Sequence, residues 1–108
     1  MSEELDDESR ARRAEPVRCF YGVLNESMTN NDVDGFLALW RSLCKSFRPL
    51  ADDVMYCFDR VVDDPPPDLV EKYKEATGYA LNHVDGVSYV RGLRDQMRRI
   101  YDTPGADA

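Results

Sequence analysis

The chain has 108 residues, of which 43% are hydrophobic, so its length suits one domain with a modest apolar core. Its formal net charge is -7 at pH 7 and its isoelectric point is about 4.6. This acidity argues against direct binding of nucleic acid through a basic surface. It favours a protein partner whose own surface is basic.

The reactive residue types do not form a recognisable cofactor or metal motif. Cys19, Cys44 and Cys57 are widely spaced in apolar stretches, which is typical of reduced core thiols rather than a disulfide framework. His83 is the only histidine and is interpreted as a polar turn residue, and there is no CxxC pair. We therefore expect neither a metal site nor a cofactor.

The start of the chain shows no targeting signal. The N-terminus is acidic rather than basic and then apolar, and no apolar run approaches the roughly eighteen residues that a membrane span requires. The expected location is the cytoplasm. Residues 1–15 hold acids followed by arginines, with Leu5 as the only large apolar side chain. Because such a segment buries too little surface to offset its ordering entropy, we expect a mobile charged arm.

Helical periodicity begins at Pro16, a residue type suited to a first helical turn. The apolar stripe of this first helix is Val17, Phe20, Tyr21 and Leu24. Asn30 or Asn31 is the predicted N-cap of the second helix, which has the strongest periodicity in the chain. Its stripe is Val33, Phe36, Leu37, Trp40, Leu43, Cys44 and Phe47, and Trp40 is therefore expected in the core.

Further helices are expected from Pro49 to about Asp63, from Pro67 or Asp68 to Gly78, and from about Val87 to Tyr101. The predicted fold class is all-α, a small antiparallel bundle of four to five helices. We expect one domain spanning residues 16–102 and a frayed tail at residues 103–108.

Acidic side chains are concentrated around the junction VVDDPPPDLVE, whereas the last helix is rich in arginine. One interpretation is a solvated helix face, partly paired with those arginines. The other is a contact surface, because prolines stiffen the junction and lower the entropic cost of binding, and tyrosine is common at interface hot spots. The partner-contact candidates are Asp52, Asp53, Tyr56, Asp59, Asp63, Asp64, Asp68 and Glu71.

The paired carboxylates do not indicate an enzyme. Adjacent helix residues point about 100° apart, so neither Asp52-Asp53 nor Asp63-Asp64 forms a ready chelate. No nucleophile or phosphate-binding loop accompanies them. We predict no catalytic residues.

Three stretches follow one another between Cys19 and Tyr101: FYGVLNESMTNNDVDGFLALWRSL, LADDVMYCFDRVVDDPP and YALNHVDGVSYVRGLRDQMRRI. In this order they resemble the colicin D immunity family, also described as bacterial self-protective colicin-like immunity proteins. The first stretch is similar to the family's opening helix, polar turn and second helix. The second resembles its acid-bearing helix with a proline turn, and the third its closing Asp-Gly turn and basic helix.

The resemblance implies a four-helix antiparallel bundle that inhibits a cognate toxin, typically a nuclease and in some cases a tRNA-cleaving one. The immunity protein would be a monomer that forms a heterodimer with the toxin and covers its basic substrate-binding surface. Acidic side chains on a rigid face would steer association and pair with arginine. Two alternatives are a DNA mimic that inhibits a nucleic-acid enzyme and a helical adaptor whose groove binds a partner helix.

Overall fold

The computed structural model describes residues 7–81 and 85–102 of the chain. These residues form six α-helices, one short 3-10 helix and no strand. The elements are α1 (Asp7–Ala14), α2 (Pro16–Ser27), η1 (Thr29–Asn31), α3 (Val33–Ser46), α4 (Arg48–Asp63), α5 (Leu69–Thr77) and α6 (Gly86–Asp102). The all-α prediction is thus confirmed for this part of the chain, with six α-helices rather than four or five. His83 and the predicted tail at 103–108 lie outside the described residues.

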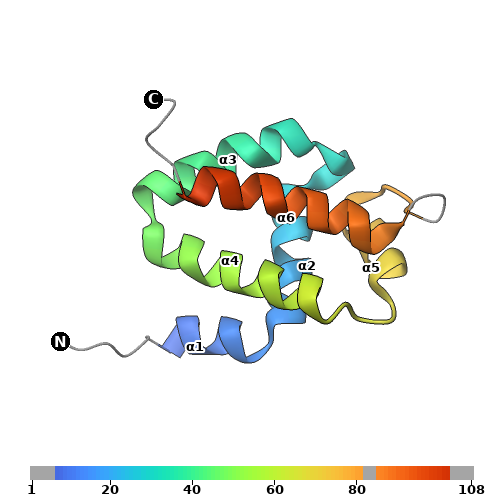
Figure 1. Ribbon diagram of the computed structural model, residues 1–108, viewed down its shortest axis with the longest axis horizontal. Coiled ribbons are helices and arrows are strands. Elements are labelled where there is room, and N and C mark those ends of the chain that lie inside the picture. The colour runs from blue at the N-terminus through green and yellow to red at the C-terminus, as the bar shows by residue number, and fades with distance from the viewer. Residues whose placement is uncertain (1–6, 82–84, 103–108) are drawn as a thin grey trace.

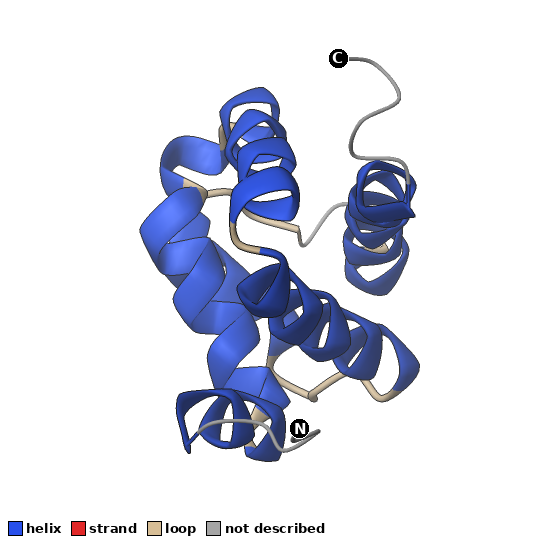
Figure 2. Cartoon of the chain, turned by 90° about the vertical axis from the view of Figure 1, so that its left-hand side faces the viewer, coloured by secondary structure: helices blue, strands red, loops and turns tan. Residues whose placement is uncertain are grey.

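The helix α4 occupies the centre of the molecule and packs against α1, α2, α3 and α6. Figure 1 shows α3, α6, α4 and α1 as successive rows, with α2 crossing behind them and α5 at one end. The view turned by 90° shows the helices joined by short loops (Figure 2). Within the described ranges, no helix combines the length and the apolar character needed to cross a membrane.

Aromatic side chains from three helices meet in the core. The ring of Phe58 on α4 packs edge to face on Phe20 of α2, with 4.8 Å between centroids, and lies 6.4 Å from the ring of Phe36 on α3. Trp40 is only 2% exposed, and its indole N–H donates a hydrogen bond of 2.9 Å to the carbonyl oxygen of Met97. The prediction that Trp40 belongs to the core is confirmed.

The turn η1 determines how α2 leads into α3. Asn30 and Asn31 have φ values of 62° and 55°, in the left-handed region that asparagine enters more readily than most residues. The Asn31 side-chain oxygen accepts a hydrogen bond of 2.6 Å from the Tyr73 hydroxyl, and its amide nitrogen donates one of 2.9 Å to the Tyr89 hydroxyl. One asparagine therefore ties this turn to α5 and α6.

The N-cap of α3 is Asp32, so the prediction of Asn30 or Asn31 is wrong. The Asp32 carboxylate accepts a hydrogen bond of 3.0 Å from the backbone N–H of Gly35. A Cβ atom at position 35 would clash with that carboxylate. The glycine, which is unfavourable within a helix, therefore makes room for the cap.

Replacing Asp32 with alanine should lower the free energy of unfolding by about 1 kcal/mol, because the first turn of α3 loses its side-chain acceptor. Urea denaturation monitored by circular dichroism measures this loss. Asp34→Ala is the matched control, since Asp34 is an exposed carboxylate in the same first turn that does not cap the helix. Equal destabilisation by the two substitutions would contradict the assignment of the cap.

Several predicted boundaries agree with the structure. Pro16 begins α2, Pro49 lies in the first turn of α4, and α4 ends at Asp63 before the three prolines. Gly78 follows α5 with a φ of 81°, the left-handed conformation common after helices. The carboxylate of Asp85 accepts hydrogen bonds from the backbone N–H groups of Val87 and Ser88 at the start of α6. The hydrogen bonds from Ser88 contribute most to holding the pKa of Asp85 below its usual range.

The mobile arm predicted for residues 1–15 is wrong from Asp7 onward. Asp7–Ala14 forms α1, which packs on α4 and α2, while residues 1–6 lie outside the described ranges. The prediction failed because it was based on the lack of apolar side chains, and α1 indeed has no apolar stripe to bury. Ser9, Arg12 and Arg13 lie at i, i+3 and i+4 on one helix face and are held by polar contacts instead.

Candidate functional site

The predicted contact residues lie on α4, on the α4–α5 connection and, for Glu71, in the first turn of α5, and they fall into two groups. Three carboxylates are paired with other residues of the fold, and four make no ion pair among the described residues. The first group is Asp52, Asp53 and Asp59. The second group is Asp63, Asp64, Asp68 and Glu71, together with the exposed ring of Tyr56.

Asp53 is a structural residue between α4 and α1. It is 2% exposed, and one carboxylate oxygen accepts hydrogen bonds from the Ser9 hydroxyl at 2.6 Å and from Nε of Arg13 at 2.7 Å. Nε of Arg12 lies 3.7 Å from the other oxygen. A buried carboxylate must be paired in this way to remain inside a fold. The structure therefore places Asp53, a predicted contact residue, inside the fold and not on the surface.

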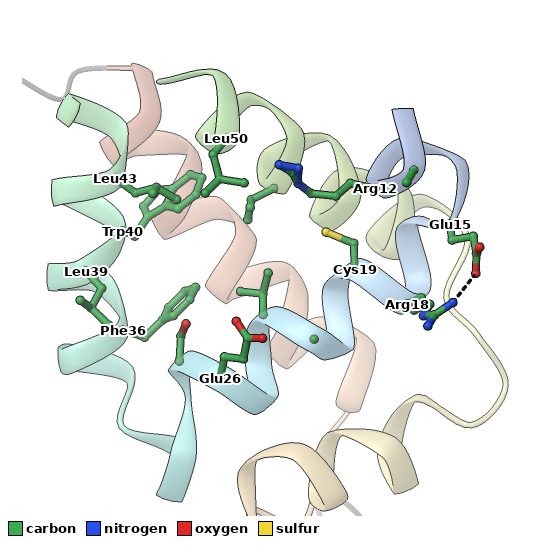
Figure 3. A pocket seen from close by; sticks show the side chains of 15 residues that line it. Arg12, Glu15, Arg18, Cys19, Glu26, Phe36, Leu39, Trp40, Leu43 and Leu50 are labelled. Atoms are coloured by element: carbon green, nitrogen blue, oxygen red, sulfur yellow. Dashed lines mark ion pairs between the residues drawn. The ribbon is translucent and has the colours of Figure 1, made fainter. Parts of the chain in front are cut away.

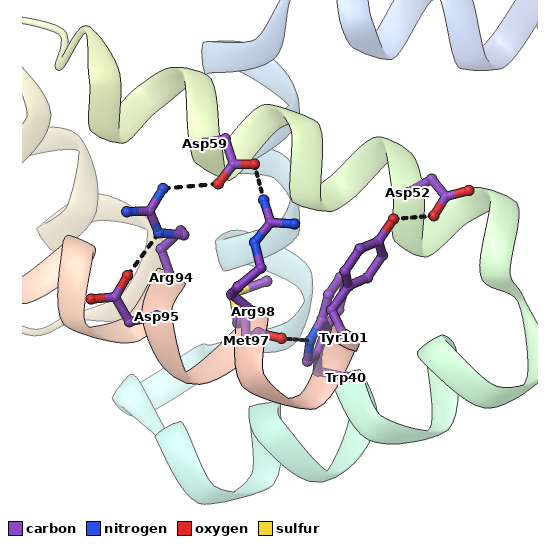
Figure 4. A network of polar contacts seen from close by, with 8 residues as sticks. All are labelled: Trp40, Asp52, Asp59, Arg94, Asp95, Met97, Arg98 and Tyr101. Carbon is purple, nitrogen blue, oxygen red and sulfur yellow. Dashed lines mark hydrogen bonds and ion pairs between the residues drawn. The ribbon is translucent and has the colours of Figure 1, made fainter. Parts of the chain in front are cut away.

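Asp59 joins α4 to α6. Its carboxylate accepts a hydrogen bond of 2.9 Å from Nη1 of Arg94 and another from Arg98, and Arg94 also pairs with Asp95 at 2.9 Å (Figure 4). The interpretation that part of the acidic face is paired with arginines of the last helix is thus confirmed for this residue. Since Arg94 and Arg98 are engaged in the fold, the last helix presents less free positive charge than its sequence suggests.

Asp52 makes a second link between α4 and α6. It accepts a hydrogen bond from the Tyr101 hydroxyl (Figure 4). Its carboxylate also lies 3.5 Å from Nε of Arg48. The Arg48 guanidinium stands 3.8 Å above the centroid of the Tyr101 ring. Burial and then the hydrogen bond to Asp52 raise the pKa of Tyr101. This carboxylate is only partly available to a partner.

The four remaining carboxylates, Asp63, Asp64, Asp68 and Glu71, form what we call the acidic junction. Among the residues that the structure describes, none of the four makes an ion pair, and all except the half-buried Asp68 are exposed. Asp68 lies near Tyr21, where burial and then the charge of this carboxylate raise the pKa of Tyr21 to about 12. The acidic junction therefore carries negative charge that the fold leaves without a counter-ion.

Tyr56 lies on α4 near the acidic junction and is 37% exposed. The Arg13 guanidinium stands 5.0 Å from the centroid of its ring, a distance typical of a cation–π contact. The ring therefore both holds α1 and offers an aromatic surface. Tyr73, the other tyrosine in this region, is fully buried.

A second surface is an apolar groove that the sequence did not predict. A cavity of about 740 Å³ lies between α2 and α3, with α4 behind it and α1 at one end (Figure 3). Its lining is Ala11, Arg12, Glu15, Arg18, Cys19, Gly22, Val23, Glu26, Ser27, Phe36, Leu39, Trp40, Leu43, Leu50 and Val54. We call it the α2–α3 groove. The sequence signals were Val23 and Leu39, apolar residues outside the predicted stripes of α2 and α3.

The cysteines lie in α2, α3 and α4. All three are free thiols, with Cys44 and Cys57 buried and Cys19 half-buried in the wall of the α2–α3 groove. The Cys57 thiol donates a weak hydrogen bond of 3.5 Å to the carbonyl oxygen of Arg12. Within the described ranges, no three His, Cys, Asp or Glu side chains gather as metal ligands would.

Comparison of the chain with protein-family models, with curated proteins and with solved structures found no match. Functional inference therefore rests on the two surfaces, the acidic junction and the α2–α3 groove.

Replacing Asp53 with alanine should lower the free energy of unfolding by roughly 2 to 3 kcal/mol, because hydrogen bonds to a charged group are lost and two arginines lose their counter-ion. It should also release α1, which amide hydrogen exchange of residues 7–14 detects. Asp63→Ala, on the same helix but exposed, is the control and should change stability by less than about 0.5 kcal/mol. Unchanged protection of α1 in Asp53→Ala would show that other contacts hold this helix.

Proposed function

We propose that this chain is an immunity protein that binds a cognate bacterial toxin and covers its basic substrate-binding surface with the acidic junction. The supporting observation is that only some carboxylates along α4 and the α4–α5 connection have ion-pair partners among the described residues. Asp53 and Asp59 are paired with arginines of α1 and α6, whereas Asp63 and Asp64, which follow directly, have no ion-pair partner in the described part of the chain. A partner with arginines or lysines would supply the missing counter-ions.

The chemistry of a nuclease target fits this surface. A nuclease holds substrate phosphates with lysine and arginine, and carboxylates compete for the same cations. Such charges raise the rate of encounter and disfavour wrong partners. The toxin in this proposal is a nuclease, and the family resemblance implies that tRNA-cleaving nucleases are among the candidates. The immunity protein has no catalytic role of its own in this proposal.

The backbone of the acidic junction is stiff, which favours binding. Pro65, Pro66 and Pro67 each fix one backbone angle, and the flanking residues Val62 and Leu69 are buried in the core. The carboxylates are therefore held near one arrangement before a partner arrives. Less conformational entropy is lost on binding than for a flexible acidic loop.

Co-expression tests the function itself. The reading frame immediately upstream of this gene is expressed in a bacterial host with and without the chain, and surviving cells are counted. The proposal predicts that the upstream product kills when expressed alone and that co-expression restores growth. A harmless upstream product, or killing that the chain does not relieve, would contradict the proposal.

Neutralising the acidic junction tests the surface. The triple variant Asp63→Asn, Asp64→Asn, Asp68→Asn should lose protection against the toxin, because steering and cation pairing are removed together. The control is Glu8→Gln, Asp34→Asn, Asp102→Asn, which changes net charge equally at exposed positions on other elements. Full protection by the first variant, or equal loss in both, would show that the acidic junction is not the contact surface.

A further inference from the structure

We propose that Cys19 of α2 and Cys57 of α4 are a redox-sensitive thiol pair, which hydrogen peroxide oxidises to a disulfide that joins the two helices. Both are free thiols in the structure, and their side chains are hydrogen-bonded to each other. Neither residue belongs to the acidic junction, so the pair can react whether or not the chain neutralises a toxin.

The packing of α2 on α4 holds the two thiols together. The residues that directly follow them, Phe20 and Phe58, pack edge to face with 4.8 Å between ring centroids. Cys57 is fully buried, and its thiol also lies 3.5 Å from the carbonyl oxygen of Arg12 on α1. The Cys57 proton therefore has two acceptors within reach, this carbonyl oxygen and the Cys19 sulfur. Since the core already places the sulfur atoms in contact, a disulfide requires only a small movement of the side chains.

The two thiols differ in access and in acidity. Cys19 is half-buried and lines the α2–α3 groove, through which a small oxidant can reach it (Figure 3). The hydrogen bond from Cys57 lowers the pKa of the Cys19 thiol, burial opposes this effect, and the charge of Arg12 adds to it. The same hydrogen bond and then burial raise the pKa of Cys57. Because the thiolate is the reactive form, Cys19 is the thiol that attacks the peroxide.

The oxidation consists of two balanced steps. The Cys19 thiolate attacks one oxygen of hydrogen peroxide, so that an S–O bond forms, the O–O bond breaks and the leaving hydroxide takes up a proton to become water. The Cys57 sulfur then attacks the sulfur of the Cys19 sulfenic acid, gives up its proton and displaces a second hydroxide, which also leaves as water. The thiol pair loses two electrons, and the peroxide gains them.

Cys44 provides a comparison within the same chain. It is buried on α3, and burial raises the pKa of its thiol. The charges that act on it are those of Arg48 and Asp52, whereas Arg12 acts on Cys19. We therefore expect Cys44 to remain reduced when the pair is oxidised.

Mass spectrometry of the folded chain after treatment with hydrogen peroxide tests the proposal. The native chain should lose the mass of two hydrogen atoms, and peptide mapping should place the link between Cys19 and Cys57. An alkylating reagent added after unfolding should label only Cys44, and dithiothreitol should restore labelling of all three cysteines. The oxidised chain should keep its helix content by circular dichroism and unfold at a higher urea concentration than the reduced chain, because the link restricts the unfolded state.

Three alanine variants separate the roles of the thiols, since alanine removes the sulfur without burying a hydroxyl. Cys57→Ala should stop at the Cys19 sulfenic acid, which dimedone traps as an adduct on Cys19. Cys19→Ala should leave Cys57 reduced at the same peroxide concentration, because that thiol is buried. Cys44→Ala is the matched control and should form the disulfide as fast as the native chain.

Three labelled thiols after peroxide treatment would overturn the proposal, and so would a link that includes Cys44. A disulfide that forms only in denaturant would show that the native fold does not hold the pair for reaction. Cross-linking between two chains, or oxidation of Cys19 to the sulfinic acid without a disulfide, would also contradict the proposal.

Discussion

Two carboxylates on the central helix hold the ends of the described fold together by pairing with arginines. Asp53 binds the polar helix α1 through Arg12 and Arg13, and Asp59 binds α6 through Arg94 and Arg98. The helix α1 depends on this pairing because it has no apolar stripe of its own. A buried or half-buried carboxylate without such a partner would be costly, so the charge of α4 and the arginines of the flanking helices constrain each other.

This pairing also determines what the surface offers to other molecules. Once Asp53 and Asp59 are neutralised within the fold, the uncompensated acids of this segment are concentrated beyond them, in the acidic junction around the prolines. The apolar side chains of α3 that the core does not cover face the α2–α3 groove instead. One face therefore carries uncompensated negative charge, and the other exposes apolar side chains such as Leu39.

Local sequence signals predicted the all-α fold class and several helix ends. The helix ends were predictable because Pro16, Pro49 and Gly78 act through their own backbone preferences. They could not distinguish Asp52 from Asp53, because two adjacent aspartates look alike until the position of α1 decides which one is buried. The α2–α3 groove was missed for a similar reason. It arises from the angle between α2 and α3, whereas periodicity describes one helix at a time.

The most direct measurement is the association rate constant of the purified protein with the proposed toxin, determined from about 50 to 500 mM salt for the native chain and the acidic-junction triple variant. We expect the association rate constant to fall steeply with salt for the native chain and less steeply for the variant, because screening acts on the charges that steer encounter. Identical rates and identical salt dependence for the two proteins would contradict the claim that the acidic junction recognises the partner.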